Sequence, residues 1–364
     1  MFHLIEDIYS VRIIYDLISY ILCFLLLIYT LNVKKFINKF YFILLISSVS
    51  PFFFNNLLFD WYQFPDQSKY LFIAQSIRSL DFDLLKDTGI VLLLPGIIYS
   101  LFPIPVIYSF TTISILSRTF FLITIISTFK EYKKDKAVLF FLLFCPSIIL
   151  YSSIGLRETF IFSFLILFFF NLKRNKFYTA LIFLSLLILI KAELGLMIIL
   201  SLIVYYFLFS KINNYLKYMF LYLCLLFFYE FNDTILEYIN KRYLGFYHEE
   251  FLHFPKIYEN YIDIIIKLPF KLLNFMLSPL LEITNPLRFF QIFENLFIYI
   301  FLFLYFKNCY NINKLSTLYW LIILFLNLSI YSLVVENPGS ITRYKISLFV
   351  FIILCLNNFK KKNV

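Results

Sequence analysis

Long apolar runs separated by short polar clusters dominate the chain from one end to the other. A helix needs about 20 mostly apolar residues to cross the hydrocarbon core of a bilayer, and many of these runs approach that length. The predicted spans are residues 13–31, 40–59, 104–129, 137–153, 159–172, 177–190, 194–209, 215–231, 291–306, 315–335 and 346–356. Residues 90–102 form a shorter apolar run with a Pro-Gly pair, which favours an interfacial or re-entrant segment. The pattern therefore predicts an all-α polytopic membrane protein with about eleven transmembrane helices.

The positions of lysine and arginine give these spans an orientation. Tight basic clusters follow the runs that end at residues 31, 129, 172 and 356, and cytoplasmic loops carry an excess of such residues. Alternation from there places the N-terminus outside, and every cluster that mixes acidic and basic residues falls on the outer face. We therefore expect one integral membrane domain over residues 1–364, with outer loops at about 60–89 and 232–290.

The composition agrees with a membrane protein. Of the 364 residues, 62% are hydrophobic, which is more apolar surface than a soluble fold of this size could bury. The formal net charge of +10 does not indicate nucleic-acid binding, because many of the basic residues lie in short loops between apolar runs. The five cysteines have no paired spacing, so we expect them to pack in the interior without forming a disulfide or holding a metal.

A polar stretch, FPDQSKYLFIAQSIR at residues 64–78, separates two strongly apolar regions and is the leading functional candidate. Asp66, Tyr70 and Ala74 are four residues apart, so on a helix they share one face. At the edge of the bilayer, Asp66 could act as a general base or anchor a polar substrate. The alternative is a solvated carboxylate paired with Lys69.

A second candidate, Arg157-Glu158, follows a predicted span whose end is rich in serine. The guanidinium of arginine suits a phosphate because its fork of donors can bind two oxygens at once. Charges at such a boundary are costly and are often functional. The alternative is an internal ion pair that holds the end of the helix.

Two further polar clusters should reach the same side of the membrane. Lys191 and Glu193 divide two apolar runs, where Lys191 could contact a phosphate, although a plain helical hairpin would look the same. The stretch from Glu336 to Lys345 contains a Pro-Gly pair that predicts a turn, and Arg343 and Lys345 offer cationic donors before the last span. An ordinary outer loop is the alternative.

The sequence gives weak support for a metal. Asp81 and Asp83 form a DxD triplet of the kind that some sugar transferases use to hold a divalent metal, but three letters recur by chance. No P-loop, GxGxxG or GxSxG motif is present, so nucleotide-driven and serine-hydrolase functions have no support. A divalent metal is therefore possible, and no other cofactor is implied.

The patterns PDQxxYxxxA and PSxxxYSSxxxRE resemble those of polytopic glycosyltransferases of the GT-C superfamily. The later NPGSxTRYK stretch resembles membrane proteins of bacterial polysaccharide gene clusters, some of which are labelled oligosaccharide-repeat or O-antigen polymerases. The GT-C resemblance implies a GT-C-like fold in which Asp66 is the acidic residue of an outer loop. It also implies that Arg157-Glu158 and Arg343 lie near a lipid phosphate.

From this resemblance we expect a multi-pass glycosyltransferase of the bacterial inner (cytoplasmic) membrane. A polyprenyl-phosphate-linked sugar would enter from the membrane lipids, with its phosphate held by Arg157, Arg343 and Lys191. Asp66 would deprotonate or orient the hydroxyl of a glycan, lipid or protein acceptor. Positioned cations would stabilise the charge that develops on the phosphate as it leaves.

Two other functions remain open. The first is a polymerase that joins whole lipid-linked repeat units. The second is a transporter or flippase, a class that usually places ionisable residues or broken helices near the midplane of the bilayer, often in repeated halves. Here the predicted polar clusters gather at one face and no internal repeat is visible, which favours the transferase.

Overall fold

The computed structural model describes residues 2–34, 40–55, 58, 64–86, 88–132, 135–209, 215, 219, 222, 230, 232–244, 258–278, 286–335 and 337–359. Its secondary structure is helical throughout this part of the chain, which confirms the all-α prediction. The helices divide between two compact units, Met1–Gly195 and Leu196–Val364, and the boundary falls in the first turn of one helix, α11 (Ala192–Phe209). Each unit is described by itself.

Six helices among the described residues are long and apolar enough to cross a membrane. They cover Ile13–Val33, Phe110–Phe129, Ala192–Phe209, Gln291–Ile312, Lys314–Val334 and Gly339–Phe359. A seventh span results if Lys136–Phe144 and Pro146–Ser153, which meet at a bend of 52°, are counted as one. Three apolar helices are shorter and are not counted among these spans: Tyr41–Phe54, Ile90–Ser100 and Phe177–Ile190. A multi-pass membrane protein is therefore supported, whereas the count of about eleven spans stays a prediction.

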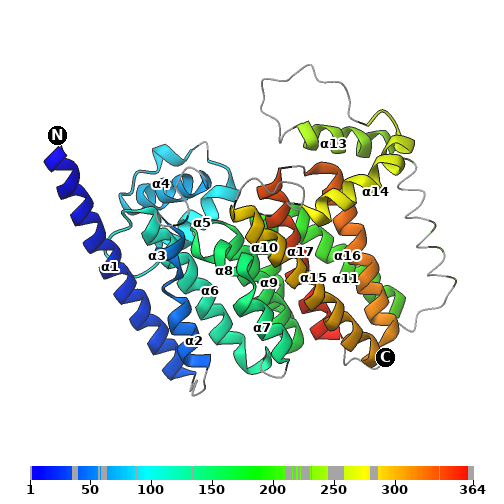
Figure 1. Ribbon diagram of the computed structural model, residues 1–364, viewed down its shortest axis with the longest axis horizontal. Coiled ribbons are helices and arrows are strands. Elements are labelled where there is room, and N and C mark those ends of the chain that lie inside the picture. The colour runs from blue at the N-terminus through cyan, green and yellow to red at the C-terminus, as the bar shows by residue number, and fades with distance from the viewer. Residues whose placement is uncertain are drawn as a thin grey trace. The chain divides into compact units, whose positions relative to one another are not determined.

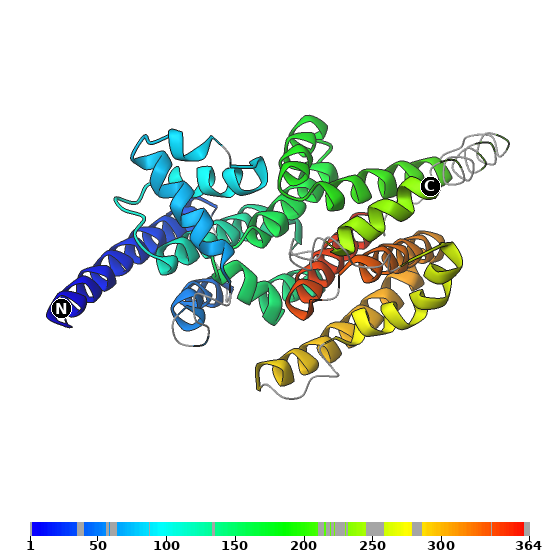
Figure 2. The same cartoon turned by 90° about the horizontal axis from the view of Figure 1, so that it is seen from above.

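Unit 1 is built around two buried helices, α6 (Phe110–Tyr132) and α9 (Glu158–Lys173). Most side chains of α9 are buried, because the helix is apolar on all sides and packs against both α6 and α10 (Phe177–Ile190). The long helix α1 (Phe2–Val33) packs along α6, and its N-terminal turns project away from the other helices of the unit (Figures 1 and 2). The other helices among the described residues of the unit are α2 (Phe40–Ser47), α3 (Ser50–Phe54), α4 (Asp66–Arg78), η2 (Asp83–Leu85), α5 (Ile90–Ser100), α7 (Lys136–Phe144) and α8 (Pro146–Ser153).

Unit 1 has two chemically different ends. At one end, Arg174 Nε lies 3.7 Å from Glu131 Oε1, so the last turns of α6 and α9 are neighbours. Both helices start at the opposite end, where α4 packs against α5 and α6. In Figure 1 the last turns of α6 lie at the bottom of the unit and α4 lies at the top. This arrangement agrees with the predicted separation of basic clusters from mixed clusters.

Close contact between α4 and α5 depends on Gly96. A Cβ atom placed on Gly96 would lie 2.3 Å from Cγ2 of Ile73, which is closer than any real side-chain contact. The two helices lie side by side in both views (Figures 1 and 2). A residue without a side chain is therefore what allows α4 to lie flat on the short apolar helix.

Arg78 fixes the other end of the contact between α4 and α5. Its guanidinium, whose pKa is lowered by burial, donates one hydrogen bond from each nitrogen to the backbone that follows α5. The acceptors are the carbonyls of Ser100 (Nε, 3.0 Å), Ile104 (Nη1, 2.7 Å) and Phe102 (Nη2, 2.6 Å). A planar fork of donors is suited to satisfying carbonyls that the end of a helix leaves without intrahelical partners.

Unit 2 centres on α16 (Lys314–Val334), which packs against α13 (Asn232–Leu244), α14 (Tyr261–Leu277), α15 (Pro286–Ile312) and α17 (Pro338–Phe359). It also contacts α11, because the Tyr319 hydroxyl donates to Ser201 O at 2.5 Å and the Tyr205 hydroxyl lies 3.2 Å from Ser316 Oγ. The described part of the segment predicted as a second outer loop, residues 232–290, thus contains α13, α14 and the first residues of α15. Its α14 exposes Ile262, Ile265, Ile266, Phe270 and Leu273 along one face, as expected of a helix that borders lipid.

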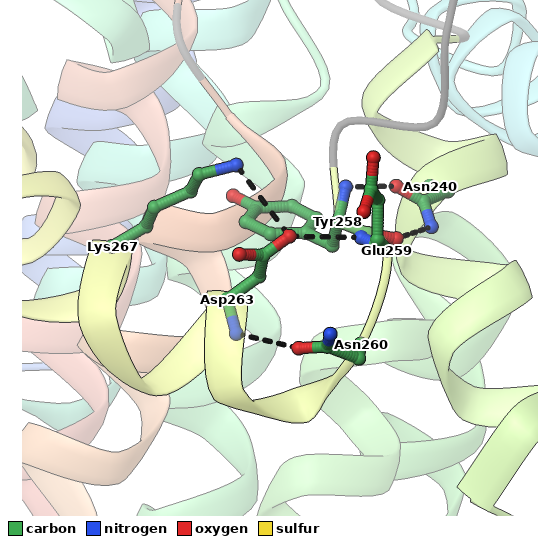
Figure 3. A network of polar contacts seen from close by, with 6 residues as sticks. All are labelled: Asn240, Tyr258, Glu259, Asn260, Asp263 and Lys267. Carbon is green, nitrogen blue, oxygen red and sulfur yellow. Dashed lines mark hydrogen bonds and ion pairs between the residues drawn. The ribbon is translucent and has the colours of Figure 1, made fainter.

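The junction between α13 and α14 is held by a polar network (Figure 3). Asn240 pairs with the backbone of Tyr258 in both directions, at 3.0 Å to its N–H and 2.9 Å to its carbonyl. Asn260 caps α14 by accepting from the N–H of Asp263 at 2.9 Å, and Asp263 in turn lies 3.9 Å from Nζ of Lys267. The network positions two helices and leaves its side chains engaged with one another, so we assign it a structural role.

The start of the last helix differs from the sequence-based prediction. The span was predicted to begin at residue 346, after a Pro-Gly turn, but α17 begins at Pro338. Proline suits the first turn of a helix because its missing N–H needs no partner there. Asn337 supports this start by accepting from Gly339 N at 3.0 Å through its side chain and from Ile341 N at 2.8 Å through its carbonyl. Arg343 and Lys345 therefore lie on a helix and not in a loop.

Candidate functional site

The first helical turn of α4 presents Asp66. Pro65 precedes it at the helix entry, and a carboxylate in the first turn is favoured by the partial positive charge of the helix N-terminus. Its Oδ1 lies 3.8 Å from Nζ of Lys69, so the ion pair considered as the alternative role exists. The Asp66 side chain is still 34% exposed and remains accessible to a substrate.

Tyr70, one turn further along α4, is buried at 1% exposure and lies among charged groups. Burial raises the pKa of its hydroxyl; Glu158 raises it further, Arg157 lowers it and Asp66 raises it. Ser114 of α6 is hydrogen-bonded both to Gln67 of α4 and to Gly155, two residues before Arg157, so the two stretches chosen from the sequence lie near each other in space. The raised pKa keeps the Tyr70 hydroxyl protonated at neutral pH, and therefore able to donate a hydrogen bond.

Arg157 and Glu158 lie where the chain turns from α8 into α9. Arg157 is the N-cap residue and is half-buried, and Glu158 is the first residue of the helix and is only 2% exposed. The helix N-terminus favours the buried carboxylate. Gly155 sets the turn against α6, because a Cβ atom there would meet Cγ2 of Ile113 at 2.2 Å.

Hydroxyl groups hold this turn against α6. Ser114 Oγ accepts from the N–H of Gly155 at 3.0 Å, and Ser117 Oγ lies 2.6 Å from Thr159 Oγ1. Ser114 also donates a longer hydrogen bond to Gln67 Oε1 of α4, at 3.5 Å. These contacts join α4, α6 and the start of α9 into one buried polar cluster, which we call the unit 1 polar cluster. Its members are Gln67, Ser114, Ser117, Glu158 and Thr159.

Lys191 belongs to the same end of unit 1. Helix α10 runs antiparallel to α9, because Thr179 near its start donates to Asn171 near the end of α9, at 3.1 Å. Lys191 follows the last residue of α10 and is buried. It therefore lies at the end of the unit where α9 begins with Glu158.

The stretch from Glu336 to Lys345, which was also predicted to bind substrate, belongs to unit 2. Lys345 is buried and donates from Nζ to Ser278 O at 2.8 Å, Met276 O at 3.1 Å and Asn295 Oδ1 at 3.1 Å. An ammonium has three hydrogens, so these acceptors use all of them, and Lys345 joins α14, α15 and α17. Arg343 lies two residues earlier on α17 and is half-buried, and Glu336 lies outside the described residues.

The metal candidates lie on the surface. Asp83 Oδ1 forms an ion pair with Nζ of Lys86 at 2.7 Å and its side chain is 85% exposed, while Asp81 is exposed as well. The described part of the chain contains no group of three or more histidine, cysteine, aspartate or glutamate side chains that could hold a metal ion. Neither aspartate belongs to the unit 1 polar cluster.

The most buried charged residue of unit 1 was not singled out from the sequence. Arg118 lies within the span of α6 and is 1% exposed. Its Nε donates to Ser47 O at 3.1 Å, its Nη1 donates to Ser152 Oγ, and its guanidinium carbon lies 5.6 Å from the ring centre of Phe121. The signal was available, because Arg118 is the single charged residue in the run 104–129.

Asp16 is a second buried charged residue that was not singled out from the sequence. It is the single charged residue in the run 13–31, lies on α1 and is buried. Thr112 Oγ1 donates to its Oδ1 at 2.6 Å and the Ser109 hydroxyl donates to the same oxygen. Ionisable residues therefore occur inside candidate spans as well as at one face, which corrects the expectation drawn from the sequence.

Comparison of the chain with protein-family models, with curated proteins and with solved structures gave no match. The assignment of function therefore depends on the chemistry of the residues described above.

Proposed function

We propose that this protein is a membrane glycosyltransferase that moves a sugar from a polyprenyl-phosphate donor to a glycan, lipid or protein acceptor at the outer face of the membrane. One observation supports this function above the others. An accessible carboxylate (Asp66), a protonated tyrosine (Tyr70) and an arginine next to a buried glutamate (Arg157, Glu158) are neighbours at one end of a helical unit. A base and a phosphate-binding cation side by side are what transfer from a lipid phosphate requires.

In the proposed reaction, the acceptor hydroxyl attacks the anomeric carbon of the donor sugar. A new carbon–oxygen bond forms there, the bond from that carbon to the phosphate oxygen breaks, and the phosphate leaves with the bonding electrons. Asp66 accepts the proton of the hydroxyl. Arg157 binds the phosphate through its fork of donors, and Glu158 limits the positions that the guanidinium can take.

The remaining residues predicted from the sequence take different roles in this proposal. Lys191 is a further cation at the same end of unit 1 and is proposed as a second contact for the phosphate. Arg343 lies on α17 of unit 2, and its contact with the phosphate stays a prediction from the sequence. Lys345 is not assigned to the substrate, because its three hydrogens are donated to protein acceptors. The bacterial inner membrane is the proposed location, since polyprenyl-phosphate sugars are carried there.

The test is a transfer assay with purified protein in lipid nanodiscs and a synthetic polyprenyl-phosphate sugar. We expect release of the polyprenyl phosphate together with a new glycosidic bond on the acceptor, and loss of both with Asp66→Asn. The length of the product separates the alternatives, because a transferase adds one sugar whereas a polymerase of repeat units gives a ladder. Turnover that survives unchanged in Asp66→Asn would contradict the proposed role of the base.

A specific observation also favours a second candidate, a transporter or flippase. Arg118 and Asp16 are buried inside candidate spans, and the pair α7–α8 is bent by 52°. Both features occur in proteins that move substrates across membranes. Movement of a fluorescent lipid-linked sugar across sealed vesicles, without a new glycosidic bond, would support this function over the transferase.

A further inference from the structure

We infer that Arg118 is an anion-binding residue whose counter-charge is supplied by a phosphate-type ligand that enters the unit 1 polar cluster. The inference deepens the proposed function and rests on it for the nature of the ligand. The evidence for it is the environment of the Arg118 guanidinium. The proposed reaction gives this guanidinium no role.

The first step is a census of the partners of Arg118. Among the described residues, its hydrogen-bond acceptors are the carbonyl of Ser47 and the hydroxyl of Ser152, and both are neutral. The ring of Phe121 lies at 5.6 Å and is neutral as well. No carboxylate of the described residues pairs with Arg118, and its Nη2 is buried without a hydrogen-bond partner among them.

The second step is a comparison with Arg78, which shows what a structural arginine looks like in the same unit. All three nitrogens of Arg78 donate to backbone carbonyls, and the residue is only partly buried. Arg118 is more deeply buried but uses two nitrogens. A residue that served only to join α8 to the end of α2 would not need a charge, because a neutral donor could reach the same two oxygens.

The third step concerns the cost of this charge. Arg118 comes eight residues after Phe110, so it lies on the order of 12 Å along the axis of α6 from the start of the helix. A guanidinium at that depth, without a counter-charge, is strongly unfavourable. Charged residues inside spans usually pair with an opposite charge or belong to a substrate path. Since the described chain offers no such partner, an anionic ligand is the simplest source of one.

The fourth step identifies the ligand class and its route. The guanidinium donates to Ser152, and the preceding residue of α8, Tyr151, accepts at its carbonyl from the Thr159 hydroxyl at 3.1 Å, so the part of α8 that holds Arg118 borders the unit 1 polar cluster. A free Nη2 beside two fixed nitrogens matches the oxygens of a phosphate, which accept several donors from one guanidinium. The phosphate could belong to a lipid or be free in solution, and the two sources share this chemistry.

The experiment measures phosphate binding to the full-length protein in detergent, without an activity readout. The probes are farnesyl phosphate, inorganic phosphate and the neutral control farnesol, with affinity measured by microscale thermophoresis and stability by thermal unfolding. We expect farnesyl phosphate at about 100 times its Kd to raise the apparent Tm by about 3 °C. A similar rise with inorganic phosphate would assign the site to free phosphate, and either result supports an anion site.

Arg118→Gln carries the decisive comparison, with Arg78→Gln as its matched control. We expect Arg118→Gln to weaken phosphate binding by roughly 10- to 100-fold without lowering the Tm of the ligand-free protein, because an uncompensated buried charge is removed. Arg78→Gln should lower that Tm and leave Kd within about twofold. If Arg118→Gln does not fold, Arg118→Lys replaces it, with an expected loss of about tenfold because one nitrogen cannot serve the protein and the ligand together.

An unchanged Kd in the Arg118 variant that folds would overturn the inference, as would the absence of any phosphate binding by the wild type. The outcomes separate this inference from the proposed function. Sugar transfer by the wild type with an unaltered Kd in the Arg118 variant would remove the anion site and leave the transferase. Phosphate binding that depends on Arg118, without any transfer, would remove the transferase and leave the anion site.

Discussion

At the scale of single residues, three arginines of unit 1 show how environment decides role. Arg78 gives all its nitrogens to backbone carbonyls, Arg118 gives two to neutral oxygens inside a span, and Arg157 stands half-buried beside Glu158. The sequence alone does not distinguish the roles of these three arginines. Only their partners distinguish a residue that holds the fold from one that is available to a ligand.

The role of Asp66 as a base gives the first prediction. Asp66→Asn keeps the shape of the side chain and removes the charge, so we expect transfer to fall by about 10²- to 10⁴-fold. Stability should change by less than about 1 kcal/mol, because the pair with Lys69 is partly exposed. Initial rates with a polyprenyl-phosphate sugar and thermal unfolding check both parts.

Lys69→Gln is the matched control for this prediction. It breaks the same ion pair but keeps the carboxylate, so transfer should stay near the wild-type rate. Equal losses in Asp66→Asn and Lys69→Gln would return Asp66 to a role in the ion pair alone.

The second prediction concerns phosphate recognition by Arg157. Arg157→Lys keeps the charge but loses the planar fork. We therefore expect weaker binding of the polyprenyl-phosphate sugar and a transfer rate lowered by about tenfold or more. Glu158→Gln should be milder in donor binding than Arg157→Ala. If Arg157 serves only to neutralise Glu158, lysine should be tolerated and Glu158→Gln should cost as much stability as loss of the arginine.

At the scale of elements, the contact between α4 and α5 determines where the candidate base lies. Helix α4 carries Asp66 and Tyr70, and it is fixed to α5 at one point by Gly96 and at another by Arg78. A change in this contact should therefore affect both stability and the position of the carboxylate.

Gly96 provides the third prediction. Gly96→Ala places a methyl group 2.3 Å from Ile73 Cγ2, so we expect it to destabilise the protein by about 1–3 kcal/mol through overpacking. Gly89→Ala is the matched control: no atom lies within 4 Å of its added Cβ, and its φ of −63° suits alanine. Thermal unfolding in detergent should separate the two, with Gly89→Ala neutral or slightly stabilising. Equal Tm values would contradict the close packing of α4 on α5.

At the scale of the whole molecule, the fourth prediction is the topology. Asp66, Glu158 and Glu336 should lie on one side of the membrane, and Lys134, Arg174 and Lys361 on the other. Within unit 1, the ion pair of Arg174 with Glu131 and the contacts of α4 with α6 agree with this separation. Glu336, Lys134 and Lys361 lie outside the described residues.

Single cysteines introduced at these positions, except at the buried Glu158, and labelled in intact cells check the topology. Of the five native cysteines, Cys23, Cys145, Cys309 and Cys355 are buried, so their background labelling should be low, and Cys224, which lies outside the described residues, is first replaced by serine. Labelling of positions 66 and 134 from the same side would remove the proposed outer-face site.

Several features of the fold could be predicted from the sequence because they depend on local composition. Apolar runs identify membrane helices whatever their partners are, and the predicted run 177–190 matches α10 at both ends. The i, i+4 spacing in residues 64–78 placed Tyr70 and Ala74 on one face of a helix, and the structure shows that both are buried on α4. The start of α17 was missed because a Pro-Gly pair can open a helix as well as end one, and Asn337 decides between the two.

The sequence by itself determined a helical membrane protein and the short polar stretches in which chemistry is concentrated, because hydropathy and helix periodicity are local properties. Only the tertiary structure decided which of these residues are neighbours. Tyr70 with Arg157 and Glu158, Arg118 with Ser47 and Ser152, and Lys345 with the end of α14 are all brought together by packing between distant helices. The physical reason is that the partners of a charge, and hence its availability to a ligand, depend on contacts across the fold that no local pattern encodes.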